Sequence, residues 1–234
     1  MQKRKFIIDA DTGSDDAVAI LMALRHPEID VQGITIVSGN VPLQQGILNT
    51  FATTEICEQK IEIYGGASNP LEREYKEIYS LEDFSSHVQS LSPVSASGQC
   101  VHGIDGMGDL GIKPNYVKFE EKNAVDFLIE SFNKEPDQIT LVTLGPLTNI
   151  AKVLEKDKSI AKKIKHCYVM GGTSDGSGNV SAAAEYNIWV DPEAANIVFN
   201  SELDITMVGW DNSYKYAMLK NEEIKALRSL KTKY

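Results

Sequence analysis

The stretch from Phe6 to Leu24, FIIDADTGSDDAVAILMAL, constrains the fold more than any other part of the chain. Its apolar start predicts a buried strand, and the helical spacing of the later apolar residues predicts a helix that begins near Ser14, a residue suited to the N-cap. Between them lie four aspartates within eight residues, at positions 9, 11, 15 and 16. Capping explains one or two of these acids, and crowded carboxylates repel one another unless they are protonated or hold a cation. Because hard oxygen ligands suit calcium or magnesium, this turn is predicted to be a metal site.

Length, charge and hydropathy limit what the chain can be. Its 234 residues, 42% hydrophobic and 24% charged, fit one large or two small globular domains with an ample core. The net charge of −10 argues against nucleic acid as a partner, because binding depends on basic side chains that displace counterions from phosphates. No apolar stretch approaches a membrane span or a signal peptide, so we expect a cytoplasmic protein with no membrane partner. The three cysteines lack a CxxC spacing and are expected to be reduced.

The rest of the chain alternates between strand and helix patterns. After the first strand, further strands are predicted over residues 31–37, 61–64, 139–143, 167–170 and 205–208. Helices are predicted over residues 42–58 and 123–133, from 147, from 192 behind an Asp191 cap, and over 220–234. This alternation predicts an α/β fold, with a mostly parallel, Rossmann-like central sheet that has helices on both faces.

The alternation breaks between residues 67 and 121. This stretch contains three prolines, many serines and the glycine-rich run from His102 to Asp109. A connection this long is usually functional or disordered, and we interpret it as a loop or lid region over the active-site face, with a short helix near residues 81–88. The alternative is an insertion that links domains and carries no chemistry.

Polar residues gather at the predicted carboxyl ends of the strands. In open α/β sheets, ligands bind at this edge, so the polar residues are expected to converge on one face and to place the active site there. The residues concerned are Asp9 and Asp11, Gly39 and Asn40, Gly65 and Gly66, Leu144 and Gly145, Gly171 and Gly172, and Asp211.

The polar residues near these strand ends suit a metal ion and a neutral sugar. Asp11 and Asp16 are the natural metal ligands, and the backbone carbonyl of Leu144 could supply a third oxygen. Further carboxylates and amides could bind the hydroxyl groups of a sugar, and the absence of a lysine or arginine cluster favours a neutral sugar over a phosphate. These further residues are Asp15, Asn179, Glu185 and Asn187, of which Asn179 could equally be a simple turn residue.

An ordered set of motifs closely resembles the nucleoside hydrolases, the family of inosine-uridine preferring N-ribohydrolases. The set extends from Phe6 to Asp211 and therefore covers nearly the whole chain. It comprises Asp9-Ala-Asp-Thr-Gly-Ser-Asp-Asp16, Gly39-Asn40, His102-Gly103 with Gly106-Met107-Gly108, Leu144-Gly-Pro-Leu-Thr-Asn-Ile-Ala151, Met170-Gly-Gly172, Gly178-Asn179, Glu185-Tyr-Asn187 and Asp191-Pro-Glu-Ala-Ala195.

The resemblance implies a single calcium-dependent domain over residues 1–234 that hydrolyses the N-glycosidic bond of ribonucleosides, as in purine and pyrimidine salvage. It implies that Asp11, Asp16 and the Leu144 carbonyl hold Ca²⁺, and that Asp11 deprotonates the attacking water in a reaction with an oxocarbenium-like transition state. The ribose would be held by Asn40, Asp15, Asn179, Glu185 and Asn187, with Met170 lining the sugar pocket. His102 could close near the base, or it could be simply exposed. Family members commonly form dimers or tetramers, which makes a homo-oligomer possible.

The chain departs from the family pattern near its end. Family members continue further and carry a C-terminal His-Asp pair, whose Asp completes calcium coordination and whose His is implicated in protonating the leaving base. The four histidines here are His26, His87, His102 and His166, and none of them follows Asp211. We expect a truncated and catalytically impaired homologue, although a substitute acid such as His102 or Tyr214, or completion by another chain, would also explain the difference.

Two other functions compete with hydrolysis. A homologue without the acid could bind metal and nucleoside or ribose without turnover. A phosphatase of the haloacid dehalogenase type also starts with a strand and a D-x-D turn, but it requires Thr or Val where this chain has Gly13. The sequence leaves the base preference open, because the residues on the base side lie partly in the loop region and partly in the absent segment.

Overall fold

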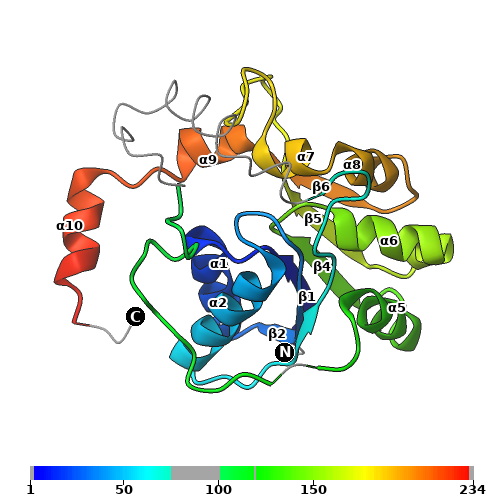
Figure 1. Cartoon of the computed structure of the whole chain (residues 1–234), viewed down its shortest axis with the longest axis horizontal. Coiled ribbons are helices and arrows are strands. Elements are labelled where there is room, and N and C mark those ends of the chain that lie inside the picture. Colours follow the sequence, from blue (N-terminus) through cyan, green and yellow to red (C-terminus); the bar gives the residue numbers. More distant parts are fainter. Residues whose placement is uncertain (1–2, 75–100, 119, 232–234) are drawn as a thin grey trace.

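A computed structural model describes residues 3–74, 101–118 and 120–231 of the chain. Its centre is a six-stranded sheet in the order β3-β2-β1-β4-β5-β6, and every neighbouring pair of strands is parallel (Figure 1). The strands are β1 (Arg4–Ala10), β2 (Ile29–Ile36), β3 (Ile63–Gly65), β4 (Ile139–Thr143), β5 (His166–Met170) and β6 (Ile205–Val208). From β1 the chain adds β2 and β3 on one side of the sheet, and then β4, β5 and β6 on the other side. The order in which strands are added therefore reverses between β1 and β4, and doubly wound sheets bind their ligands at this point.

Helices pack on both faces of this sheet, as predicted. On one face, Ile8 and its neighbours on β2 form a core with α1 (Ser14–Arg25) and α2 (Leu43–Ile56). On the other face, Ile7 and its neighbours on β4 and β5 pack against α5 (Ala124–Lys134), α6 (Thr148–Lys156) and α8 (Pro192–Phe199). Because successive strand residues point to opposite faces, the consecutive isoleucines of β1 contribute to both cores.

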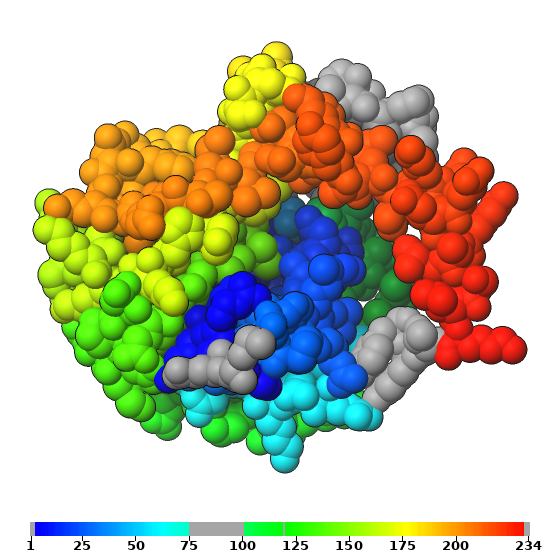
Figure 2. All heavy atoms as spheres, turned by 180° about the vertical axis from the view of Figure 1, so that it is seen from behind, coloured from blue at the N-terminus to red at the C-terminus, as the bar shows by residue number. Residues whose placement is uncertain are grey.

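The remaining helices are short or lie at the surface. They are the 3₁₀-helix η1 (Lys158–Lys162), α7 (Tyr186–Val190), α9 (Trp210–Tyr216) and α10 (Asn221–Ser229). Helix α10 has no buried residue. It stands apart from the body of the molecule and is drawn in red in Figure 2. Apolar side chains of β5 and β6 are also exposed, including Tyr168 at 42% and Val208 at 39%.

Most predicted elements are confirmed, with shifts of one or two residues at their ends, but the helix predicted over residues 220–234 ends at Ser229, where the extended backbone of Leu230 caps it. Strands 139–143 and 205–208 have the predicted bounds, and Asp191 caps α8 by accepting a hydrogen bond from the Ala194 amide at 3.0 Å. Ser14 is not the N-cap of α1: Gly13 holds that position, and the Asp16 carboxylate accepts its amide at 2.9 Å. The interpretation of residues 67–121 as a lid stays a prediction, and residues 75–100, with the helix expected near 81–88, lie outside the described part. No helix in the described ranges has the length and apolar character needed to cross a membrane.

Candidate active site at the strand ends

The turn between β1 and α1 places two carboxylates in the interior at the point where the sheet order reverses. Asp11 is fully buried and Asp16 is 5% exposed. Between them, Thr12 has a φ of 23°, a left-handed conformation that is uncommon for a residue other than glycine. Its hydroxyl lies 2.7 Å from the Thr50 hydroxyl on α2. The turn is therefore held in an unusual conformation by the helix that packs beside it.

The Asp11 carboxylate lies between the loops that follow β2 and β4, the strands on either side of β1. Its Oδ2 accepts the Asn40 amide at 2.5 Å. A Cβ at Gly39 would lie 2.0 Å from Oδ2, and a Cβ at Gly145 would lie 2.8 Å from Oδ1, so only glycine fits at both positions. Its Oδ1 is buried and has no hydrogen-bond partner among the described residues. Such an atom is rare in a native interior and is expected where an ion or water binds.

Burial dominates the electrostatics of this acidic pair. Desolvation raises the pKa of Asp11 to about 6 and raises the pKa of Asp16 well above its ordinary value, and the charge of Asp11 adds to the shift of Asp16. Two buried carboxylates in contact are not both ionised unless a cation neutralises them. Together with the unpartnered Oδ1, this pair fits a hard divalent cation.

Among the residues described, no cluster of three or more acidic, histidine or cysteine side chains is suited to a metal, so a further candidate oxygen must come from the backbone. The Leu144 carbonyl follows β4 directly, beside the β1 end that leads into Asp11. It accepts a hydrogen bond from the Asn187 side-chain amide at 2.7 Å. A carbonyl oxygen has two lone pairs, so this bond leaves one available.

The start of α7 brings three predicted site residues together. Glu185 caps this helix, since its carboxylate accepts the amides of Asn187 at 2.9 Å and Ile188 at 3.3 Å. It also accepts the Gly172 amide at 2.9 Å, and burial raises its pKa. The Asn187 amide contacts both the carbonyl and the sulfur of Met170 at 3.2 Å. Glu185, Asn187 and Met170 thus form one network beside the Leu144 carbonyl.

The Asn179 side chain joins this network by bonding the backbone of α7 rather than an acidic side chain. Its Oδ1 accepts the amide of Tyr186, the first residue of α7, at 2.8 Å. The Tyr186 hydroxyl donates in turn to the Gly39 carbonyl at 2.9 Å, next to Asn40. The loop that carries Asn179 is therefore tied both to α7 and to the loop after β2.

His102 and Asp15 meet on the outer side of the turn. The His102 Nδ1 lies 2.8 Å from the Ser14 hydroxyl and 3.7 Å from the Asp15 carboxylate. A Cβ at Gly13 would lie 3.1 Å from the Asn40 side-chain amide and 3.4 Å from the His102 ring, so these residues surround the turn. The Asp15 side chain is 68% exposed, and its carboxylate is therefore open to a ligand.

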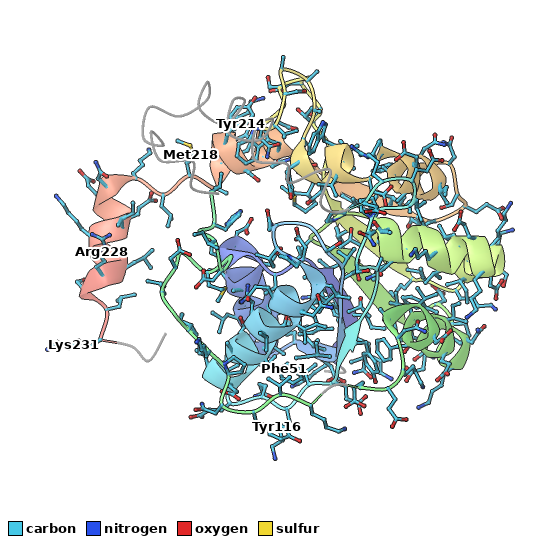
Figure 3. The ribbon with its side chains drawn as sticks, in the orientation of Figure 1. Phe51, Tyr116, Tyr214, Met218, Arg228 and Lys231 are labelled. Atoms are coloured by element: carbon cyan, nitrogen blue, oxygen red, sulfur yellow. The ribbon has the colours of Figure 1, made fainter. Side chains whose placement is uncertain are left out.

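Tyr214, considered above as a substitute acid, makes a different contact. Figure 3 labels it on α9, and its hydroxyl donates to Asp175, which also accepts the Lys215 ammonium at 2.6 Å. These bonds hold the pKa of Asp175 below its usual range. Asp211, at the start of α9, accepts the amide and hydroxyl of Ser174 at 2.8 and 2.7 Å. Helix α9 thus fastens the loop that contains Ser174 and Asp175.

Sequence reasoning did not find the buried amides behind the site. Asn149 on α6 donates to Asp9 at 2.8 Å, and Thr35 donates to the same oxygen at 2.5 Å. Burial raises the pKa of Asp9 to about 7. Asn49 on α2 bonds the turn itself. The pairing of Asp9 with Asn149 joins two of the quoted motifs, but no pattern marks Asn49, which lies in an ordinary helix.

Comparison with known proteins agrees with this geometry. The sequence profile of the family described as "Inosine-uridine preferring nucleoside hydrolase" matches residues 6–234. The chain belongs to this family. Uridine nucleosidase 1 of Arabidopsis thaliana is 40% identical over 88% of the chain and 56% of its own length. The pyrimidine-specific ribonucleoside hydrolase RihB of Escherichia coli is 36% identical over 90% of the chain and 61% of its own length.

Solved nucleoside hydrolase structures share the fold. A plant nucleoside hydrolase, the PpNRh1 enzyme, superposes with a TM-score of 0.86 at 35% identity and covers 99% of this chain, which spans 67% of that protein. A purine-preferring ribonucleoside hydrolase from Gardnerella vaginalis gives a TM-score of 0.84 at 36% identity, covering 98% of this chain and 67% of its own. The family match decides against the dehalogenase-type phosphatase. The chain spans only 56–61% of the length of the curated relatives above. The activity of this chain is therefore proposed below.

Proposed function

We propose that this chain carries the metal and ribose half-site of a calcium-dependent nucleoside hydrolase, which cleaves the N-glycosidic bond of ribonucleosides to give ribose and free base. The observation that carries the proposal is the buried pair of Asp11 and Asp16, with the unpartnered Asp11 Oδ1 at the reversal point of the sheet. Neither capping nor any hydrogen bond from the described residues uses that oxygen.

The proposed ion is calcium, held by Asp11, Asp16 and the Leu144 carbonyl. Calcium accepts carboxylate and carbonyl oxygens in flexible arrangements and leaves places for water and substrate hydroxyls. When bound, the ion would supply Lewis acidity at the ribose hydroxyls and at the attacking water. This ligand set contains only hard oxygens, which do not favour zinc or copper.

The chain's own residues would perform the remaining steps. Asp11 takes the proton of the attacking water at Oδ1, the oxygen that its neighbours leave unbonded. The exposed Asp15 carboxylate accepts hydrogen bonds from a ribose diol. Each oxygen of Glu185 already accepts backbone amides, so this residue offers a fixed acceptor with little freedom to rotate. The other ribose contacts proposed are Asn40, Asn179 and Asn187, with Met170 lining the sugar pocket and His102 on the base side.

Binding without turnover is the second candidate function. A nucleobase leaves readily only when it is protonated, and among the residues described only His102 is a histidine next to the turn. Its Nδ1 is already within hydrogen-bond distance of the Ser14 hydroxyl. A chain that holds metal and ribose but lacks an effective acid would be impaired by about 10²–10⁴-fold on nucleosides. It would keep its affinity for both ligands.

Hydrolysis of p-nitrophenyl β-D-ribofuranoside, inosine and uridine, with calcium and then with a chelator, tests the proposal. Nitrophenolate leaves without protonation, so this substrate isolates the metal and ribose half-site. Calcium-dependent cleavage of the nitrophenyl riboside alone supports a working half-site without an acid, and cleavage of all three supports a complete hydrolase. Asp11→Asn should lower either rate by at least about 100-fold, whereas Asp204→Asn, a matched change at an exposed acid, should not.

Failure of the folded protein to cleave any of the three would refute the hydrolase. Calcium and nucleoside binding measured by calorimetry would then separate a binder from a chain with neither function. The printed names of the relatives include both pyrimidine-specific and purine-preferring enzymes, so competition between uridine and inosine must measure the base preference. A homodimer or tetramer, and a cytoplasmic location, remain predictions, the first measurable by sedimentation velocity.

A further inference from the structure

One buried side chain joins the two segments that flank the proposed site. Asn49 lies on α2 and is 1% exposed. Its side-chain amide donates to the Thr12 carbonyl at 3.0 Å and to the Asp105 carbonyl at 2.9 Å. Its side-chain oxygen accepts the Gln45 side-chain amide at 2.9 Å. Asn49 therefore uses both of its donor hydrogens on backbone carbonyls that lie 37 and 56 residues away in sequence.

The first of these carbonyls belongs to the metal turn. Thr12 follows Asp11 directly and has the left-handed φ of 23°. A conformation of this kind persists only where the surroundings fix it. Two contacts from α2 do so: Asn49 binds the Thr12 carbonyl, and Thr50 lies 2.7 Å from the Thr12 hydroxyl.

The second carbonyl belongs to the segment 102–109, which carries His102 and is internally braced. The Asp105 carboxylate accepts the amides of Met107 and Asp109, and the Asp109 carboxylate accepts the amides of Ile104 and Asp105. The Gly108 amide donates to the His102 carbonyl at 2.7 Å. Such a braced segment moves as a unit, so a bond to its Asp105 carbonyl also sets the position of His102.

Close packing confirms that this segment lies directly on Asn49. A Cβ at Gly106 would lie 2.6 Å from Val41 Cγ1 and 3.1 Å from the Asn49 side-chain nitrogen. At the far end of the segment, His102 reaches Ser14 at 2.8 Å. Segment 102–109 thus touches the metal turn and its supporting helix at two separate points.

We propose that Asn49 is a positioning residue that couples the conformation of the metal turn to the docking of segment 102–109, and so places His102 beside the sugar site. The coupling itself concerns only contacts within the chain, while its use in catalysis rests on the function proposed above. Displacement of either segment from Asn49 should loosen the other, because one amide group supplies both hydrogen bonds.

Amide hydrogen exchange of Asn49→Leu, measured without metal or substrate, tests the coupling directly. Leucine is similar in size but leaves both carbonyls without their donor, so the Gly13, Gly106 and Gly108 amides should exchange at least about tenfold faster. Amides of β5 and β6 should not change. The control is Gln45→Leu, which removes only the bond to the Asn49 oxygen and should leave all three glycine amides near their parent rates.

A second pair of variants approaches the coupling from the loop side and covers the case in which Asn49→Leu fails to fold. Gly106→Ala and Gly111→Ala both place alanine at positive φ, 76° and 66°, but only the first would meet Asn49, since a Cβ at Gly111 has nothing within 4 Å. Gly106→Ala should speed exchange of the Gly13 amide, and Gly111→Ala should not.

The NMR signals of the His102 imidazole nitrogens report on the position of His102 itself. They would not change if Asn49 only stabilised the fold. Gly106→Ala should shift the His102 Nδ1 signal toward that of a solvated histidine, while His166, bonded to Asp204 and Thr206, serves as the internal reference. Exchange that rises in one segment only, or equally throughout the sheet, or a Gly111→Ala that matches Gly106→Ala, would overturn the coupling. Calorimetric calcium titration separates it from the proposed function: a parent chain that binds no calcium refutes the metal site but leaves the exchange result standing.

Discussion

The glycines on either side of Asp11 allow a sharp test of the metal site. A Cβ at Gly39 would lie 2.0 Å from Asp11 Oδ2 and 2.6 Å from its Cγ. Carbon and oxygen atoms pack at about 3.5 Å, so Gly39→Ala must move the carboxylate or the loop by more than about 1 Å. A bound metal tolerates deviations of only about 0.2 Å in its ligand distances. The substitution should therefore remove Asp11 from the metal site without removing its charge.

The size of the effect follows from what is lost. The Asn40 amide holds the Asp11 carboxylate in place, and loss of such an outer-shell partner of a metal ligand typically weakens metal affinity by about 10–100-fold. A loss of about 2.7 kcal/mol corresponds to a roughly 100-fold weaker calcium affinity. At a calcium concentration about 100 times the parent dissociation constant, calcium should stabilise the parent by about 2.7 kcal/mol and the variant by only about 0.4 kcal/mol. For a domain of this size these values correspond to shifts in Tm of about 5–10 °C and about 1 °C.

Thermal unfolding with and without calcium measures this difference. Gly65→Ala is the matched control, because a Cβ there would meet only Ile47 Cδ1, at 3.2 Å. The control should keep the full calcium shift, and both variants should retain the parent circular dichroism spectrum. A Gly39→Ala protein whose calcium-dependent shift equals that of the parent would refute the assignment of Asp11 as a metal ligand.

Three further results are expected. Lys215 and Tyr214 lower the pKa of Asp175, so the stabilisation by Asp175 should be complete above the usual aspartate pKa of about 3.9 and should fade below it. Urea unfolding curves of Asp175→Asn and the parent should then differ at pH 7 and converge in acid; a constant gap would argue against this. Burial raises the pKa of Cys167 to about 12, so iodoacetamide at about pH 8 should label it only after unfolding, and rapid labelling of the native protein, seen by peptide mass spectrometry, would exclude this burial. Phe132→Ala empties a fully buried position and should cost about 3–5 kcal/mol in urea unfolding, whereas a cost below about 1 kcal/mol would contradict its place in the core.

Buried, regular elements could be predicted from the sequence, and marginal ones could not. Strand β4 is a largely apolar run between the polar pair Asp137-Gln138 and the Gly145-Pro146 turn, and its predicted bounds of 139–143 are confirmed. Helix α7 was missed because it has only five residues and is capped by a glutamate instead of the usual small polar residue. Helix α9 was missed for a related reason: seven mostly polar residues from Trp210 to Tyr216 give no apolar periodicity.

The site was predictable where its residues follow strands and unpredictable where contacts join distant segments. The carboxyl ends of parallel strands meet at one edge, which is why Asp11 and Leu144 could be assigned to the same edge of the sheet from the sequence. Ser14 was expected to cap α1, yet its hydroxyl lies 2.8 Å from His102, and the Asp16 carboxylate takes the Gly13 amide instead. The contacts of Asn49 depend on how a loop docks on a helix, which no local pattern encodes.

The four aspartates of the turn have different surroundings, so each can have a different role. Asp9 is buried and its Oδ1 accepts Thr35 and Asn149, so that oxygen fixes the strand ends, while its Oδ2 has no hydrogen-bond partner among the described residues. The Asp15 side chain is 68% exposed and lies 3.7 Å from His102, and it is proposed above as a substrate contact. Asp11 and Asp16 alone combine deep burial with mutual contact and elevated pKa values. Like charges are brought together inside a protein at a cost of several kcal/mol unless a cation compensates them, and this cost favours the proposed metal site over a turn that serves only to cap α1.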